Sequence, residues 1–304
     1  GNDRRPTKVE APEWMEYTVS DPTGYYNNEF YFYLEAGENT ISLQAQKEPV
    51  VLDTITLRER KTNITYEEYK AMNEAAGYTK APEDFSIFLE AEFCSATSTS
   101  TVYAQNDKSS AINSPQSAAA NLINVIGGNS NSYTWSSVGQ WIEWKFVIPE
   151  GKAGLYTINT RFLQSASEGL FVSRRLYLDG EVPFEEANNL EFMYGGGWSV
   201  GALNDGQTEF EFYLSEGEHT LKLEVNLGNI GEIISEIRDC VTRINEIYIK
   251  ILQISGTDPD PYMDYSYYKR IPDEISDMGV IAQRLFDVSE RMQQISGKTS
   301  SSTA

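Results

Sequence analysis

The residue types that most often carry catalysis are scarce in this chain. Its one histidine, His219, lies in the turn of a repeated segment whose first copy has Asn39 at that place. We therefore expect a turn residue, and neither a Ser-His-Asp nor a histidine–metal grouping. The glycine run 195–197 lacks the Lys-Ser/Thr that completes a phosphate-binding loop, and HExxH and CxxC are both absent. We predict that the chain is not an enzyme.

Carboxylates are the one plentiful catalytic group, since the chain has 45 acidic side chains. A glycoside hydrolase needs only two of them at the right separation. Because no pair is marked by its sequence context, a hydrolase is the less favoured interpretation.

Aromatic side chains in polar surroundings indicate another kind of chemistry, the reversible binding of sugar. The C–H face of a pyranose packs on an indole or phenol ring, while its hydroxyls need polar partners. Trp135 and Trp198 lie in Gly/Ser/Asn-rich sequence, although either indole could equally plug an end of the fold. The candidate sugar-binding residues are Trp135, Trp198, Tyr103, Tyr133, Asn129, Gln164 and Arg174. Residues such as Asn129, Gln164 and Arg174 are also common in solvated loops.

Charge excludes some partners. The formal net charge is −21, from 45 acidic and 24 basic side chains. Such a chain repels the phosphates of nucleic acid and of anionic lipid, so we expect no nucleic-acid partner and no direct membrane insertion. Two cysteines in 304 residues make no disulfide framework, and we predict that Cys94 and Cys240 are buried thiols.

A repeat gives the first indication of how these residues are positioned. Residues 30–43, FYFYLEAGENTISL, recur as residues 210–223, FEFYLSEGEHTLKL, with eight identities in fourteen positions. Apolar residues alternate on both sides of a glycine, which predicts a β-hairpin in each copy. Duplicated modules are typical of binding proteins, in which linked sites gain effective concentration.

The pattern predicts a mainly β protein with α-helices, in five parts. Residues 1–60 carry strands at 15–19, 30–34, 40–44 and 50–57 and form a partial β-sandwich module, whose opening strands we expect upstream in a longer parent. Residues 61–85 are a helical linker that begins at a capping box on Thr65 and ends at Gly77.

Residues 86–228 are predicted to form a complete β-sandwich. Its expected strands lie at 87–93, 141–148, 155–162, 176–178, 208–214 and 220–225, and Trp144 is predicted to lie in the core. The polar stretch 95–137 is expected to be a long functional or disordered loop.

The remaining parts are helical. Residues 229–297 carry two apolar stripes of helical period, one from Ile230 to Ile254 and one from Met278 to Ile295 with heptad spacing. They predict an antiparallel hairpin of two long helices, followed by a flexible tail at 298–304.

Several motifs in order resemble known families. The segments 88–92 (FLEAE), 139–144 (GQWIEW) and 154–158 (GLYTI) are similar to the galactose-binding-like jelly-roll β-sandwich of carbohydrate-binding modules. Together with 126–128, 175–186, 212–214 and 256–262, they resemble the non-transporter portion of large extracellular solute-binding lipoproteins, which serve carbohydrate ABC importers of Gram-positive gut bacteria.

This resemblance implies a non-catalytic, carbohydrate-binding accessory region of such a solute-binding protein. Its partners would be an oligo- or polysaccharide, the remainder of the parent protein and the ABC permease. It would be extracellular and attached to the cell surface through a lipid anchor outside this chain.

The resemblance also implies a possible structural calcium, for which Glu90 and Glu92 match the family's ligand strand. The same two residues are equally typical of polar strand positions, and two carboxylates are fewer than the six to eight oxygens that calcium prefers. A third interpretation is that the chain is a structural spacer or protein-docking scaffold of the same lipoprotein.

Overall fold

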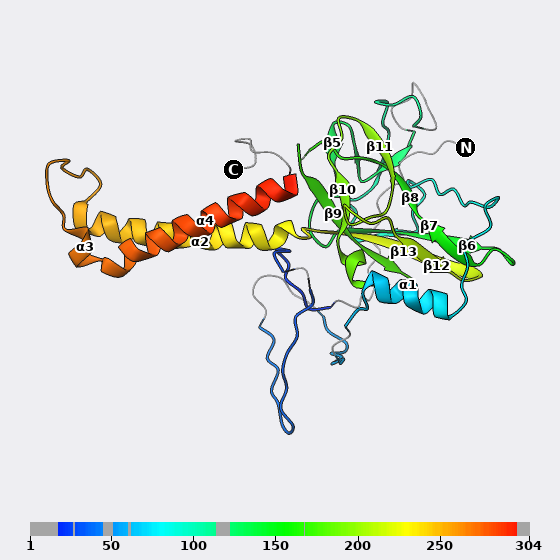
Figure 1. The fold of residues 1–304 in the computed structure, drawn as a ribbon, viewed down its shortest axis with the longest axis horizontal. Coiled ribbons are helices and arrows are strands. Elements are labelled where there is room, and N and C mark those ends of the chain that lie inside the picture. Colours follow the sequence, from blue (N-terminus) through cyan, green and yellow to red (C-terminus); the bar gives the residue numbers. More distant parts are fainter. Residues whose placement is uncertain are drawn as a thin grey trace.

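The computed structural model describes residues 18–26, 28–44, 51–59, 62–113, 122–166 and 168–296. The chain is mainly β with helices, and its named strands all pair in antiparallel fashion. Figure 1 shows a β body with a pair of long helices projecting from it. The mainly β class predicted from the sequence is therefore confirmed.

One layer of the body is a five-stranded sheet in the order β1-β6-β13-β9-β10. Its members are β1 (Ala96–Thr97), β6 (Trp141–Ile148), β13 (Gly217–Asn226), β9 (Phe171–Leu178) and β10 (Leu190–Met193). The strand predicted at 141–148 is β6, and its alternation works as expected because Ile142 and Trp144 are buried. No strand forms at 87–93, where the backbone is irregular and turns at 91–93, so that prediction was wrong.

The facing layer consists of two short ladders. β7 (Gly154–Thr157) pairs with β12 (Glu211–Leu214), and β8 (Asn159–Leu163) pairs with β11 (Trp198–Ala202). The single strand predicted at 155–162 is broken at Ile158, because its two halves join different partners. A core of Ile142, Leu176 and Leu223 from the first layer and Phe212, Phe184 and Phe210 fills the space between the layers.

The second repeat copy is an arch that joins two sheets, which corrects the predicted hairpin. β12 pairs with β7 in one layer, whereas β13 pairs with β6 and β9 in the other. The two arms therefore face each other across the core instead of bonding side by side. An alternating pattern specifies which side chains are buried, and an arch and a hairpin satisfy it equally well.

Helix α1 (Tyr66–Ala75) does more than link two modules. Its N-terminus has the predicted capping box, in which Thr65 and Glu68 bond each other's backbone. The Tyr66 hydroxyl accepts a 2.9 Å hydrogen bond from the amide of Glu211, and the Tyr69 hydroxyl accepts one of 2.8 Å from Tyr213. Two tyrosines one helical turn apart thus satisfy the outer edge of β12, so that α1 forms part of the sandwich.

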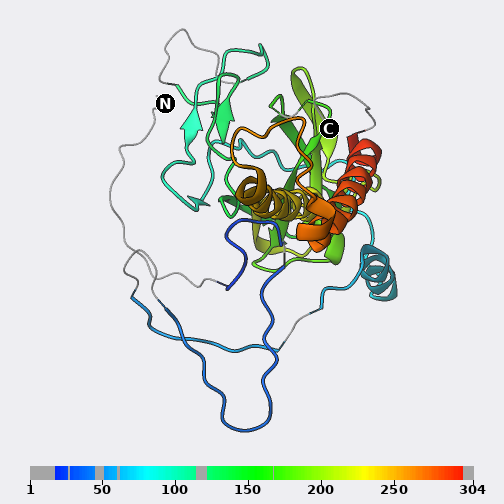
Figure 2. The same cartoon turned by 90° about the vertical axis from the view of Figure 1, so that its left-hand side faces the viewer.

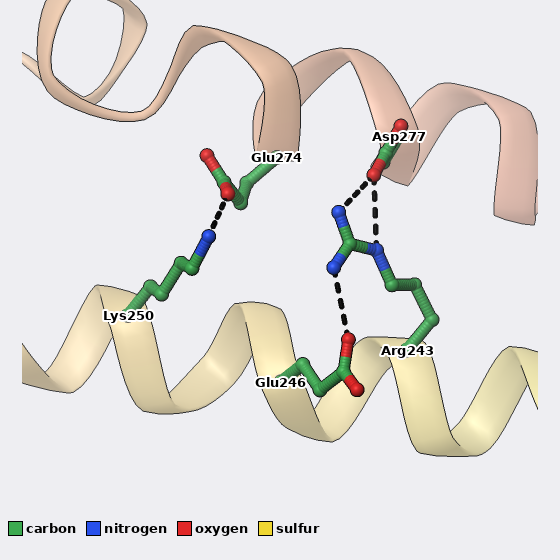
Figure 3. Close-up of polar contacts among 5 residues, drawn as sticks. All are labelled: Arg243, Glu246, Lys250, Glu274 and Asp277. Atoms are coloured by element: carbon green, nitrogen blue, oxygen red, sulfur yellow. Dashed lines mark hydrogen bonds and ion pairs between the residues drawn. The ribbon is translucent and has the colours of Figure 1, made fainter.

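The projecting pair is α2 (Ile230–Ser255) and α4 (Pro272–Ser296), joined through the short α3 (Tyr267–Arg270). The two predicted long helices are confirmed. A small core of Cys240, Ile247 and Ile281 holds them together. Figure 3 shows polar links across the pair, from Arg243 to Asp277 and from Lys250 to Glu274.

The two thiols differ in environment. Cys240 is fully buried, Cys94 is half-buried, and neither forms a disulfide within the described part of the chain. Burial raises the pKa of the Cys94 thiol. In those same ranges, no helix is both long and apolar enough to cross a bilayer.

The strands predicted in the N-terminal module do not form in its described residues. Residues 30–44 and 51–57 are extended but belong to no strand, and their apolar side chains are exposed. The described part of 18–44 has one isolated bridge, between Ser20 and Glu29. Figures 1 and 2 show residues 28–44 as a loop that projects away from the β body. Residues 15–17, 50 and the predicted tail 298–304 lie outside the described residues.

Candidate functional site

The 95–137 stretch was predicted to be a long polar loop. Its described parts instead contain short strands and buried apolar residues. It contains β1 and four more short strands: β2 (Ala104–Gln105), β3 (Val125–Ile126), β4 (Gly128–Asn129) and β5 (Ser132–Tyr133). Val102, Ile123 and Val125 are buried within it. The stretch also encloses an open hollow of about 460 Å³, lined by Tyr103, Ala104, Gln105, Asn106, Asp107, Lys108, Leu122, Ile123, Asn129, Ser130 and Asn131.

Asp107 fixes the walls of this hollow. One carboxylate oxygen accepts a 2.5 Å hydrogen bond from the amide of Ser109, and the other accepts a 2.7 Å bond from Ser130. The side chain of Asn124 bonds both the N–H and the C=O of Asp107, at 2.7 and 2.8 Å. Burial alone would raise the pKa of Asp107, but the bonds from Ser109 and Ser130 outweigh it and lower that pKa below its usual value.

Two of the predicted sugar-binding residues, Tyr103 and Asn129, line the hollow. The side-chain Nδ2 of Asn129 donates to Gln105 Oε1 at 2.9 Å, and its side-chain Oδ1 accepts from the backbone N–H of Asn131 at 3.0 Å. Asn129 therefore orients Gln105 and the 129–131 turn. Beside it, Ser130 and Asn131 are exposed at the mouth of the hollow.

Trp198 does not line the hollow, but it bonds Ser109, the residue after the lining residue Lys108; it lies on a strand and not in the glycine-rich loop that precedes it in sequence. It opens β11, and its indole Nε1 donates a 3.0 Å hydrogen bond to the hydroxyl of Ser109. The guanidinium of Arg161, on β8, lies 4.4 Å from the ring centroid. Arg161 is diagonal to Trp198 across the ladder, where cross-strand side chains meet. The indole is partly exposed.

Arg161 is itself held in place from the hollow's loop. Its guanidinium donates to Asn113 Oδ1 at 2.5 Å and to Ser110 Oγ at 3.0 Å. These bonds fix the cation over the Trp198 ring, a cation–π arrangement that strengthens as water is excluded. The 105–113 segment thus connects the hollow with the aromatic platform at β11.

Trp135 is partly exposed, like Trp198, but it packs on the core cluster, as expected of a residue that plugs an end of the fold. Its Nε1 donates to the carbonyl of Gln140 at 3.0 Å, and the ring packs against the core cluster. The Arg174 guanidinium lies 4.2 Å from the ring centroid and donates to the Trp135 carbonyl at 3.0 Å. Arg174 is buried, and this burial lowers its pKa to about 10.

The last two candidates, Gln164 and Tyr133, differ in the exposure of their side chains. Gln164 is buried, donates to the carbonyl of Leu170 at 3.2 Å and accepts from the amide of Ala166 at 3.0 Å, so it shapes its own loop. Tyr133 is exposed, and its hydroxyl lies 2.5 Å from Ser165 Oγ. Only Tyr133 of these two presents its side chain at the surface.

The predicted calcium ligands are not brought together with others. Glu90 is exposed and Glu92 is buried, and neither belongs to a strand. Within the described residues no three His, Cys, Asp or Glu side chains form a group that could hold a metal ion. The calcium site stays a prediction from the resemblance.

The structure does assemble a serine, histidine and aspartate, which the sequence analysis did not expect. His219 is a buried residue of β13, with Nδ1 2.7 Å from Asp179 Oδ2. Its Nε2 lies 2.8 Å from the carbonyl of Ser215 but 3.5 Å from the Ser215 hydroxyl. The carbonyl is the nearer partner of Nε2, and their contact is a hydrogen bond only in the form that carries a proton on Nε2, which has no lone pair there to activate the hydroxyl.

The sequence did not single out Asp107, Ser109 or Arg161 as site residues. Asp-Lys-Ser at 107–109 is typical of a turn, and Arg161 alternates with apolar residues as any outward-facing strand residue does. Only the pairing of β8 with β11 puts Arg161 next to Trp198. No local signal carries that information.

Comparison with known proteins gives few matches. No family model and no curated protein match the chain. A cycloisomaltooligosaccharide glucanotransferase of Paenibacillus sp., solved with cycloisomaltoheptaose, is 20% identical and superposes at a TM-score of 0.33, covering 53% of this chain and 20% of its own.

A family 35 carbohydrate-binding module from Clostridium thermocellum is 18% identical at a TM-score of 0.23, covering 29% of this chain and 59% of its own. The chain thus spans less than two thirds of either protein. Because both scores are low, the function proposed below depends on the geometry of the chain itself.

Proposed function

We propose that the chain binds carbohydrate without catalysing a reaction, at the hollow lined by residues 103–108, 122–123 and 129–131 and at the Trp198 ring that Ser109 holds. The observation that carries this proposal is an open hollow whose lining residue Lys108 is followed by Ser109, which holds a partly exposed indole. Sugar ligands need both features, an aromatic face for their C–H groups and amides or hydroxyls for their hydroxyls.

The chemistry of the hollow supports a neutral polar ligand. Its lining offers the side chains of Gln105, Asn106, Asn131 and Tyr103, together with one cation, Lys108, and one carboxylate, Asp107. That carboxylate is buried, and each of its oxygens already accepts a hydrogen bond from a backbone amide. Charge therefore favours neither anions nor cations strongly, whereas hydrogen-bonding groups are abundant.

Rigidity also supports binding. The Trp198 ring is held by Ser109 and by the Arg161 guanidinium, so little side-chain entropy is lost when a sugar stacks on it. The hollow's loops are fixed by Asp107 and Asn124 in the same way. A preorganised platform is what a weakly interacting saccharide requires for measurable affinity.

In finer terms, we propose that the two-layer body is a galactose-binding-like jelly roll. We also propose that the chain is an accessory region of an extracellular, lipid-anchored solute-binding protein of a sugar ABC importer. The motif resemblance at 139–144 and 154–158 favours both proposals. The saccharide, the remainder of that protein and the permease would be its partners.

A glycan array followed by calorimetry on the full chain tests the proposal. We expect saturable binding to at least one oligo- or polysaccharide, and a roughly tenfold or larger loss of affinity on Trp198→Ala, which corresponds to about 1.4 kcal/mol. Asn131→Ala, at the mouth of the hollow, should weaken binding without touching a strand. Tyr262→Ala is the matched control, because Tyr262 is a fully exposed aromatic on the helical projection.

Two outcomes contradict the proposal. Either no glycan binds a chain whose circular dichroism shows it to be folded, or binding survives both Trp198→Ala and Asn131→Ala unchanged.

A scaffold role is the second candidate, and one observation favours it. Ile237, Val241, Ile244 and Tyr248 follow a helical stripe along α2 and are exposed, outside the small core shared with α4. Such a stripe is typical of a helix that packs against a further element. If arrays fail, Val241→Asp and Ile244→Asp become the informative variants, with co-sedimentation of the parent protein's other parts as the measurement.

A further inference from the structure

The two repeat copies share the backbone of their turn. Gly37 and Gly217 both have φ at +121°, a conformation that residues with a side chain rarely adopt. In the first copy Asn39 Nδ2 donates to the carbonyl of Glu35 at 2.8 Å. In the second, His219 Nε2 makes the equivalent contact with Ser215 at 2.8 Å. The first copy is therefore shaped for the same arch as the second.

The arms of the two copies have opposite environments. Phe212 is 0% exposed and its counterpart Phe32 is 69% exposed, and the same contrast holds at the other inward positions. The buried set is Phe210, Phe212, Leu214, Leu221 and Leu223, and the exposed set is Phe30, Phe32, Leu34, Ile41 and Leu43. Every one of these positions is apolar in both copies.

The second copy shows which neighbouring strands such arms pair with. β12 pairs with β7, and β13 pairs with β6 on one side and β9 on the other. Because the arms of an arch lie in different sheets, they cannot satisfy each other. Among the described residues, β6, β7 and β9 are already paired with the second copy. No named strand there includes or pairs with residues 32–43, while the backbone N–H of Phe30 bonds the carbonyl of Val19 beside the Ser20–Glu29 bridge.

We infer that residues 30–43 are the closing arch of a second β-sandwich, whose counterparts of β6, β7 and β9 are supplied by polypeptide other than the described residues. The partner is thus an incomplete sandwich that lacks its last two strands, and recognition is by strand addition on both of its sheets. This inference is independent of carbohydrate binding.

The second copy also predicts the register of the docked arch. Phe30, Phe32 and Leu34 should face the partner's core from one sheet, with Ile41 and Leu43 opposite them. In the second copy Asp179 accepts a 2.8 Å hydrogen bond from the amide of Thr220. Since Thr40 is the equivalent residue, the partner should present a carboxylate to its amide.

Exchanging sequence between copies tests whether the first one encodes this arch. In a full-length graft, residues 210–223 are replaced by FYFYLEAGENTISL. We expect it to keep a cooperative unfolding transition and the β-type circular dichroism of the wild type. In a control graft, called the shifted graft, the phenylalanines and tyrosines of the first arm are exchanged, which gives YFYFLEAGENTISL. It has the same composition but points its phenylalanines outward, and it should lose the cooperative transition.

A milder variant protects the test against simple misfolding of the graft. Ser215→Glu with His219→Asn introduces only two of the first copy's turn residues, those that make the contact closing the turn, and we expect the turn and the transition to survive. Failure of this double variant would overturn the inference, as would equal behaviour of the in-register and shifted grafts.

Hydrogen exchange and sedimentation on the wild-type chain test the missing partner. Amides of β12 and β13 that open only on global unfolding should exchange about 1,000-fold or more slowly than those of 30–43. The chain should sediment as a monomer. Equal protection of both copies would mean that the first arch is already paired within the chain. A dimer that Phe32→Asp dissociates would mean that a second copy is the occupant, and either result overturns the inference.

Discussion

Phe212→Ala and Phe32→Ala remove the same side chain from equivalent positions of the two repeat copies, and we expect very different losses of stability. Phe212 is fully buried, with its ring centroid 5.6 Å from that of Phe184. Truncating a core phenylalanine costs about 3–5 kcal/mol. At about 2–4 °C per kcal/mol for a domain of this size, Tm should fall by roughly 6–20 °C.

Phe32 gives the matched expectation. Its ring is 69% exposed, so truncation should change stability by no more than about 0.5 kcal/mol, or roughly 2 °C. Thermal unfolding followed by circular dichroism, with urea denaturation as a second method, measures both variants against the wild type. Equal losses would refute the reasoning, because they would mean that the first arch is buried in solution. A negligible loss at Phe212 would refute the two-layer core.

Three further predictions concern the sandwich and the walls of the hollow. Tyr69→Phe leaves a β12 amide without its acceptor and should cost about 1–3 kcal/mol in urea denaturation, whereas the exposed control Tyr262→Phe should cost nothing measurable. Burial, and next the charge of Asp205, raises the pKa of Glu191 to about 7. The folded state therefore binds the proton more tightly than the unfolded state, and it loses stability as pH rises from about 4.5 through 7. Glu191→Gln should be more stable than wild type by about 1 kcal/mol at pH 8, after allowing for solvent screening. The two proteins should be equally stable near pH 4. The pKa of Asp107 is lowered, so its contribution is present above pH 3.8 and is lost as pH falls below it; the stability difference between wild type and Asp107→Asn should be constant from pH 8 to about 4 and then shrink.

Alternation made some of the fold predictable. The apolar residues of β6 recur with period two and their strand was predicted residue for residue. The capping box at Thr65 and the stripes of α2 and α4 were equally clear, because each is a local pattern with a local physical cause. Where partners lie far apart in sequence, as for β8 and β11, the same patterns gave no indication of the pairing.

The candidate site was predictable only in part for the same reason. Tyr103, Asn129 and Trp198 were chosen by residue type and context. The structure places Tyr103 and Asn129 in the lining of one hollow, and Trp198 bonds Ser109 in the segment that continues from it. Trp135 and Arg174 had equally suitable contexts, yet they stack on each other, Trp135 packs on the core and Arg174 is buried. Residue type indicates what a side chain can bind, whereas burial decides whether a ligand can reach it.

The repeat separates structure from chemistry at His219. Taken alone, a histidine between Asp179 and Ser215 resembles a catalytic grouping. The first copy keeps the turn, replaces the histidine by Asn39 and the serine by Glu35, and retains a nitrogen that donates to the same carbonyl. What both copies preserve is the donor that closes the arch, and asparagine supplies it without any acid–base capacity. The contact with the turn carbonyl is therefore common to both copies and does not depend on acid–base chemistry.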